Sequence, residues 1–394
     1  MQIGREEYVQ RMKKVQKLIA DNSLDSFIVS SKESIYYLTG VTFKPLERPF
    51  FILLRNTGPS VLLVPALERE HMTEAPNVGE VHSYWDYPAP NGSGWFEKLQ
   101  GLLKGFNNVG VEPTLTQEIA AKLSPYNVKV FPFVETVRLI KSEYEVNMLR
   151  QSAYYADIAL ASVIKAAYFG VSELELFSQG RNVQMQIIKD IEYDVLNTNI
   201  LAGAWPAPMS AQPHSVPSVD DRLKEGPHIA LTLMRVNGYS TECERTFFLE
   251  KPTKQVMEAF EVMNKARELA FRMVRPGMNC GEIDVSVKDF LTKEGYGENL
   301  LHRTGHGFGL SAHEGPWIAE GSINTLEKNM FISIEPGIYI EGVGGIRHSD
   351  TVLVTDNGYE LLTKNPTDME SLIIRSLKPL KRLKGRVMRK VMGI

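Results

Sequence analysis

The sequence predicts an α+β protein in which a smaller α/β domain precedes a larger domain of strands and helices. The chain has 394 residues, and domains of about 100–200 residues are usual, so two or three domains are expected. Residues 1–135 alternate helix-like and strand-like segments. From about residue 200 onward, strand-like segments separated by Gly- and Pro-rich turns prevail, with helices between them.

Each element of the first domain is predicted from its apolar pattern. Apolar residues recur at helical spacing from Tyr8 to Ile19, which favours an amphipathic helix. Residues 25–31 form a short apolar run typical of a buried strand, and the runs at 50–55 and 60–65 are expected to pair as further strands. Residues 116–126 return to a helical pattern.

A helical linker is predicted at residues 135–171, where long apolar-periodic stretches are polar on one face. Ser142 and Glu145 have the spacing of a capping box at its start. We therefore expect the domain boundary near residues 136–145. The predicted parts are an N-terminal domain at 1–135, a C-terminal catalytic domain at 136–375 and a basic tail at 376–394.

The second half of the chain combines β-type and helical patterns, which is the basis of the α+β assignment. Strands are predicted at 228–236, 239–250, 330–340 and 350–363, and helices at 254–274 and 280–295.

Composition excludes several classes of protein. With 43% hydrophobic and 23% charged residues the chain has the composition of a soluble globular protein, and a net charge of -3 predicts no nucleic-acid partner. Two cysteines suit a reducing compartment. The N-terminus has no apolar segment of a signal peptide, and no apolar run reaches about 18 residues. We expect a cytoplasmic protein.

The tail carries eight Lys or Arg between Arg375 and Lys390. Apolar residues near helical spacing would make it a basic amphipathic helix, although Pro379 and Gly385 weaken that pattern. A solvated or partner-packed tail is favoured over attachment to a membrane surface or to nucleic acid.

Two glutamates flank a cysteine in the stretch 238–246. Alternation along a strand puts Glu242 and Glu244 on one face and Cys243 on the other. Two like charges side by side need a metal ion or a cationic group between them, whereas Cys243 is expected in the core. The structural alternative is an exposed edge strand with Arg245 as counter-ion.

Five ordered blocks resemble the pita-bread hydrolases, which include proline dipeptidases, aminopeptidase P, methionine aminopeptidase, creatinase and ectoine hydrolase. The blocks are residues 210–218, 238–246, 305–316, 333–340 and 344–355. The resemblance implies a C-terminal pita-bread fold. It also implies that the smaller domain is of the creatinase N-terminal, ribonuclease H-like type.

The metal-dependent members of that family use five ligands: Asp, Asp, His, Glu and Glu. Carried over by position, these fall on Leu231, Glu242, His306, Glu335 and Ser349. Because two of the five ligands are missing and a third is conservatively changed, we expect no standard pair of metal ions and no cofactor. A single ion held by Glu242, His306, Glu335 and a neighbour such as His348 stays an alternative.

The resemblance to creatinase, a metal-free member, implies a different set of roles. His214 would be the general acid/base, and Glu244 and Glu335 would hold the substrate. Arg48 would bind substrate too, unless it simply pairs with Glu47 on the surface. The block around His313 is closer to the peptidases, where that histidine contacts the scissile carbonyl. The predicted catalytic residues are His214, Glu244, His306 and Glu335, and the predicted substrate-binding residues are Arg48, His313 and Glu242.

Three functions follow as hypotheses. The first is a metal-independent hydrolase of C–N bonds in an amide, an amidine or an Xaa-Pro peptide. The second is a metal-dependent Xaa-Pro dipeptidase with an altered site, and the third is a catalytically silent binding protein. The expected partner is a small molecule or dipeptide. The two-domain members also imply a homodimer, because their N-terminal domain places a loop over the partner's site.

Overall fold

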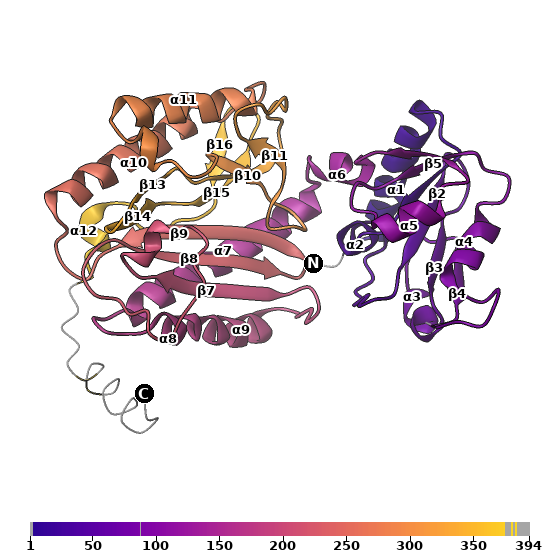
Figure 1. The fold of residues 1–394 in the computed structure, drawn as a ribbon, viewed down its shortest axis with the longest axis horizontal. Helices are drawn as coiled ribbons and strands as arrows, with labels where there is room; N and C mark the ends of the chain where they lie inside the picture. Colours follow the sequence, from indigo (N-terminus) through magenta and orange to yellow (C-terminus); the bar gives the residue numbers. More distant parts are fainter. Residues whose placement is uncertain (1–2, 87, 375–379, 381–382, 384–394) are drawn as a thin grey trace. The chain divides into compact units, whose positions relative to one another are not determined.

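The structure, a computed structural model, describes residues 3–86, 88–374, 380 and 383. It divides into two compact units, Met1–Arg138 and Leu139–Ile394, which Figure 1 shows in indigo to magenta and in magenta to yellow. The division falls after residue 138, inside the region 136–145 where the sequence places the boundary. Apart from Leu380 and Leu383, the predicted basic tail at 376–394 lies outside the described residues.

The first unit is a mixed sheet with helices around it, as the sequence predicts (Figure 1). The strands are β1 Ser26–Val29, β2 Phe51–Arg55, β3 Val61–Pro65, β4 Glu80–Tyr84, β5 Asn108–Val111 and β6 Asn127–Val130, in the order β4-β3-β2-β1-β5-β6. The helices are α1 Arg5–Asp21, α2 Lys32–Thr39, α3 Arg69–Met72, α4 Trp95–Leu102, α5 Gln117–Lys122 and α6 Phe133–Arg138. The predicted pairing of β2 with β3 is confirmed as antiparallel.

Helix α7, Glu143–Ala166, opens the second unit at the predicted capping box. The Ser142 hydroxyl accepts a hydrogen bond from the Glu145 N–H, and the Glu145 carboxylate accepts one from the Ser142 N–H. Both bonds satisfy backbone donors that the first turn of a helix leaves open. The apolar face of α7 packs against β8 and β9.

The rest of the second unit consists of three sheets with helices packed on them (Figure 1). One sheet is formed by β7 Asn199–Trp205, β8 His228–Val236 and β9 Tyr239–Phe247. A second, in the order β11-β10-β12-β15-β16, is formed by β10 Gly305–Gly307, β11 Glu314–Ile318, β12 Phe331–Ile334, β15 Asp350–Val354 and β16 Tyr359–Leu361. β13 Gly337–Ile340 pairs with β14 Gly344–Arg347. The helices are α8 Glu173–Phe177, α9 Gln179–Asp190, α10 Lys254–Met273, α11 Cys280–Lys293 and α12 Met369–Leu372.

The β-type stretch predicted at 330–340 is confirmed, but as two strands, because the chain leaves one sheet and enters another at Glu335 and Pro336. β12 ends at Ile334 and β13 begins at Gly337. Pro336 has no N–H to donate to a ladder, and the Glu335 N–H instead donates to the Thr304 carbonyl at 2.8 Å. This break places the Glu335 side chain where two sheets meet.

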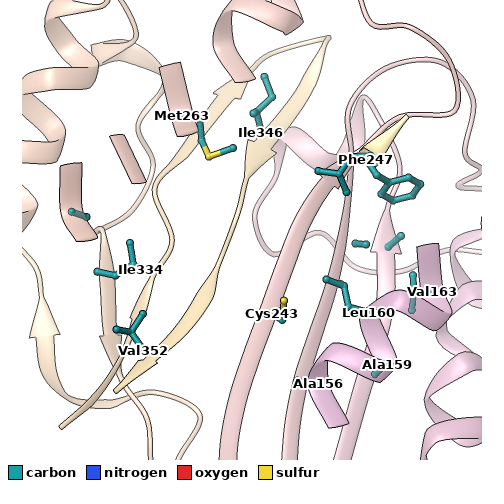
Figure 2. Packing of buried hydrophobic residues seen from close by; sticks show 14 of the residues in the cluster. Ala156, Ala159, Leu160, Val163, Cys243, Phe247, Met263, Ile334, Ile346 and Val352 are labelled. Carbon is teal, nitrogen blue, oxygen red and sulfur yellow. The ribbon is translucent and has the colours of Figure 1, made fainter. Parts of the chain in front are cut away.

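The core of the second unit contains an apolar cluster with residues of α7, β9, α10, β12, β14 and β15 (Figure 2). Cys243 is fully buried in it together with Leu160 of α7 and Val352 of β15, so the prediction that this cysteine belongs to the core is confirmed. Burial raises the pKa of its thiol, which keeps the thiol protonated. Among the described residues, no helix is both long and apolar enough to cross a membrane.

A buried ion-pair network joins β9, β15 and α10. Asp350 is fully buried and accepts from Arg245 Nη2 at 2.7 Å and from Arg267 Nε at 2.5 Å. Arg245 is therefore the partner of Asp350, which corrects the alternative in which Arg245 is the counter-ion of Glu242 and Glu244. Burial alone would raise the pKa of Asp350, but the two guanidinium groups lower it to about 2.

This network predicts that the free energy of unfolding falls in acid, and that part of the fall depends on Asp350. Since the folded-state pKa of Asp350 lies below its model value of 3.8, its contribution is present above pH 3.8 and is lost as the pH falls through about 2. The wild type should lose about 2 kcal/mol more free energy of unfolding than Asp350→Asn over this window. Urea titrations of both proteins at several pH values measure it. Equal pH dependence in the two proteins would refute it.

Candidate active site

Four segments bring polar side chains together in the second unit. β9 supplies Glu242 and Glu244, β10 supplies His306, and the break after β12 supplies Glu335. The segment that joins β14 to β15 crosses β9 by backbone hydrogen bonds between Glu244 and Ser349. Residues more than 100 positions apart in the sequence therefore share one site.

Glu242 is buried, and two polar groups lie close to its carboxyl group. The Ser349 hydroxyl donates to Glu242 Oε1 at 2.5 Å, and His306 Nε2 lies 3.8 Å from the same oxygen. Burial raises the pKa of Glu242 well above its usual value, and the nearby Glu335 and Glu244 carboxylates raise it further. Burial and the neighbouring carboxylates thus favour the protonated form of Glu242.

Glu335 is the neighbouring carboxylate and lies beside His306. His306 is fully buried, and its Nε2 lies 3.3 Å from Glu335 Oε1. Burial alone would raise the pKa of Glu335, but contact with His306, together with the charges of His302 and Arg347, lowers it overall. The pKa shifts of the two carboxyl groups therefore have opposite signs, so Glu335 ionises more readily than Glu242.

The sequence-based expectation is that Glu244 binds the substrate. In the structure, a guanidinium group of the protein already pairs with its carboxylate. Arg347 donates from Nη2 to Glu244 Oε1 at 2.7 Å, and its Nε pairs with Oε2. Arg347 Nη1 also donates to the Tyr339 hydroxyl at 2.8 Å. A cationic group of a substrate would have to compete with this buried fork, so Glu244 orients Arg347 instead of offering a free charge.

The two other predicted histidines lie towards solvent. His313 is exposed, and its ring centroid lies 3.9 Å from that of His306. Partial burial lowers the pKa of His313 to about 4, and the charge of His306 lowers it too, so its ring is neutral at pH 7. His214, in the exposed turn after Ala211, is close enough for its charge to act on His313.

Arg48 lies in the first unit, where acidic side chains engage it. Its Nε and Nη2 donate to the Asp86 carboxylate at 2.8 and 3.0 Å, and its Nη1 lies 3.1 Å from Glu47. The surface pair that the sequence left as an alternative is thus present, extended by Asp86. Substrate binding by Arg48 stays a prediction.

Both parts of the chain match known family models. Residues 147–356 match metallopeptidase family M24, and residues 11–150 match the creatinase/prolidase N-terminal domain. The chain belongs to family M24. This confirms the predicted pita-bread assignment and the creatinase-type first domain.

Relatives and solved structures agree with this assignment to M24. An uncharacterized peptidase of Staphylococcus aureus (strain USA300) is 31% identical over 89% of this chain and 99% of its own length. The prolidase from Pyrococcus horikoshii OT3 is 28% identical, with a TM-score of 0.78 over 92% of this chain and 100% of that chain. A recombinant prolidase from Thermococcus sibiricus is 25% identical, with a TM-score of 0.81 over 94% and 99%. This M24 protein is a hydrolase of C–N bonds with a prolidase-like structure.

The residues of this M24 chain do not fit a pair of metal ions. Leu231 stands opposite Glu244 in the β8–β9 ladder and has no ligand atom. At the other lost position, the Ser349 hydroxyl is used as a donor to Glu242. A fixed cation, Arg347, already lies in the carboxylate cluster, so two divalent ions would add positive charge where one negative charge is already neutralised.

His348 is also excluded as the spare ligand that the sequence suggested. It is fully buried, and its ring packs edge-on against Phe260 of α10 with centroids 5.1 Å apart. Because successive side chains of an extended segment point in opposite directions, Arg347 and Ser349 point towards the site and His348 points into the core. Burial, with the charges of Arg245 and Arg267, lowers its pKa well below the usual value.

Sequence reasoning missed Arg347 and the donor role of Ser349. Both lie in the block at 344–355, in which the sequence analysis uses only the absence of a glutamate at position 349. The available signal was alternation: once Ser349 is placed facing Glu242, residue 347 must face the same side. An arginine at that position is rarely buried unless paired, which would have pointed to one of the glutamates.

Proposed function

We propose that this M24 protein hydrolyses the C–N bond of an Xaa-Pro dipeptide or a related amide with its own side chains instead of a pair of metal ions. The observation that carries the proposal is the Arg347–Glu244 ion pair beside Glu242, His306 and Glu335. A carboxylate cluster that lacks metal needs another source of positive charge, and Arg347 provides one. The prolidases among its structural relatives favour a dipeptide as substrate.

The charges of the site suit a zwitterionic substrate. Glu335 lies next to His306 and is partly accessible, with 12% of its side chain exposed. Because Glu244 is already paired, we assign Glu335 the contact with the ammonium group or other cationic end of the substrate. Such charge-assisted bonds are worth roughly 1.5–3 kcal/mol each.

Proton transfer is assigned to the exposed histidines. His214 would take a proton from the attacking water as the new C–O bond forms, and return it to the leaving nitrogen as the C–N bond breaks. His313, stacked on His306, would donate a hydrogen bond to the carbonyl oxygen of that bond. His214 also suits this role because its turn is open to solvent.

The proposal is tested by metal analysis and a substrate screen. We expect the purified protein to contain no stoichiometric zinc, manganese, cobalt or iron. We also expect it to release the C-terminal residue from Xaa-Pro dipeptides at an undiminished rate in EDTA. Elemental analysis and chromatographic detection of free proline measure the two outcomes, with amides and cyclic amidines as further substrates. Two tightly held ions per chain, with activity abolished by EDTA, would disprove it.

A single bound ion is the second candidate, and one observation favours it. Glu242, His306 and His313 each offer a ligand atom, and these atoms lie within 4.8 Å of one another. His306 Nε2 is also buried without a hydrogen-bond partner among the described residues. One ion per chain that is lost in both Glu242→Gln and His313→Ala would establish this alternative.

The oligomeric state remains a proposal carried over from the family resemblance. We propose a homodimer at micromolar concentration, which sedimentation velocity measures directly. A monomer with full activity would contradict it.

A further inference from the structure

His214 lies in residues 206–218, which we call the His214 segment, and no side chain of the described residues holds its ring. The ring is exposed and forms no hydrogen bond or ion pair with another described residue. A general base must come within about 2.6–3.2 Å of the proton that it takes, so the orientation of its ring affects the rate. The backbone of the His214 segment must therefore set the position of this histidine.

The backbone that follows His214 is held by the indole of Trp205. Trp205 is the last residue of β7 and is buried, and its Nε1–H donates to the Ser215 carbonyl at 3.0 Å. Ser215 is buried as well, and its N–H donates to the Gln212 carbonyl at 3.2 Å. One bond within the turn and one bond from β7 thus fix the chain on the C-terminal side of His214.

Trp205 is itself supported by α8, which packs against β7 (Figure 1). The Trp205 ring lies edge-on to the ring of Phe177, the last residue of α8, with centroids 5.6 Å apart. At the other end of α8, a Glu173 carboxyl oxygen accepts from the Ser218 N–H at 3.4 Å. Helix α8 therefore supports both the indole and the end of the His214 segment.

The start of the His214 segment is held by His228, the first residue of β8. The Ala207 N–H donates to His228 Nδ1 at 2.9 Å, and His228 Nε2 lies 3.3 Å from the Lys224 carbonyl. Since a backbone N–H can only donate, Nδ1 is the acceptor and Nε2 carries the proton. Burial lowers the pKa of His228 to about 4, so the ring is neutral at pH 7 and keeps this arrangement.

We infer that Trp205 is a positioning residue for His214, because its indole N–H fixes the backbone that aims the imidazole at the attacking water, and that His228 positions the start of the same segment. Trp205 and His228 are 9% and 0% exposed, so a buried frame carries one exposed base. A base held in this way needs no reorganisation before it takes the proton. The inference rests on the proposed function for the role of His214, but the order of the segment can be measured without turnover.

The first test removes the indole N–H with Trp205→Phe, which keeps an aromatic ring beside Phe177. We expect kcat for the best Xaa-Pro dipeptide to fall about 10- to 100-fold, the scale that a misplacement of about 1 Å produces, while KM changes little. The matched control is Trp95→Phe in the first unit, which should keep the wild-type kcat. A wild-type kcat in Trp205→Phe would overturn the inference.

A pair of variants at His228 tests the start of the segment. The side-chain oxygen of Asn can accept from the Ala207 N–H, so His228→Asn should keep this bond, whereas His228→Leu has no acceptor. We expect kcat to fall in His228→Leu and to recover at least in part in His228→Asn. Thermal denaturation shows whether both variants are folded. Equal kcat in two equally stable variants would exclude a positioning role for His228.

Hydrogen–deuterium exchange gives a measurement that needs no substrate. In Trp205→Phe, amides of residues 210–218 should exchange about 10-fold faster, because one buried hydrogen bond is lost, whereas amides of α10 should keep their wild-type rates. If the wild type hydrolyses neither dipeptides nor amides but Trp205→Phe shows this faster exchange, the proposed function fails and the frame around His214 stands. If dipeptides are hydrolysed and Trp205→Phe has the wild-type exchange rates and kcat, the frame is disproved and the hydrolase stands.

Discussion

Arg347→Met should lower the free energy of unfolding by about 3–5 kcal/mol, the usual cost of removing one partner of a buried ion pair. Glu244 would then be left 5% exposed, close to Glu335 and without its counter-ion. It would either stay charged in an apolar setting or take up a proton, and both cost free energy. Tyr339 would lose the donor to its hydroxyl as well.

Two control variants separate charge from packing in this prediction. Glu244→Gln combined with Arg347→Met removes both charges, so the double variant should recover part of the loss. Arg347→Lys keeps a positive charge but cannot form the bidentate fork, and an intermediate loss is expected. Urea unfolding curves measure all three. If Arg347→Met lowers the free energy of unfolding by less than about 1 kcal/mol, the Arg347–Glu244 pair contributes no more than a solvent-exposed ion pair. The proposal that Arg347 supplies the positive charge of the site would then lose its main support.

His214→Ala should reduce turnover by about 100-fold or more, the usual scale for loss of a general acid or base. Because His214 is exposed, its replacement removes few buried contacts and should leave folding intact. The substrate for the assay is the best Xaa-Pro dipeptide of the screen described above. Steady-state kinetics give kcat and KM separately, and thermal denaturation shows that the variant is folded.

The matched control is His313→Ala, which removes the neighbouring ring but not the proposed proton carrier. We expect this variant to lose rate as well, because a hydrogen bond to the carbonyl oxygen acts in the transition state. The pH profile distinguishes the two, since only removal of the general base should abolish the ionisation that kcat depends on. Near-wild-type turnover in His214→Ala, with a large loss in His313→Ala, would move the proton carrier to His313.

Much of the fold is predictable from short stretches of sequence. β8 is found at the predicted residues 228–236, and the capping box of Ser142 and Glu145 starts α7 as expected. Both depend on local rules: period-two alternation for the strand, and a side chain that reaches backbone donors one turn away for the helix. The β-type stretches at 330–340 and 350–363 are each found as two strands, and in the first of them Pro336 breaks the ladder.

The sequence predicts which residues belong to the site, but it does not predict which of them pair with one another. Alternation correctly gives Glu242 and Glu244 one face of β9 and Cys243 the other, because that depends only on the strand. Which cation neutralises Glu244 depends on Arg347, 103 residues further along the chain. Proximity in the sequence suggested Arg245 instead, yet Arg245 bonds to Asp350.

The residue types thus decide on their own that this M24 chain lacks the carboxylates for two metal ions, since no arrangement can make ligands of Leu231. The packing of the sheets decides what replaces them. The Glu244–Ser349 bridge brings β14 and β15 against β9, turns Arg347 and Ser349 towards the glutamates and turns His348 into the core. The energy of a buried charge depends on the distance and direction of its partner, and only the tertiary structure sets these for residues so far apart in the chain.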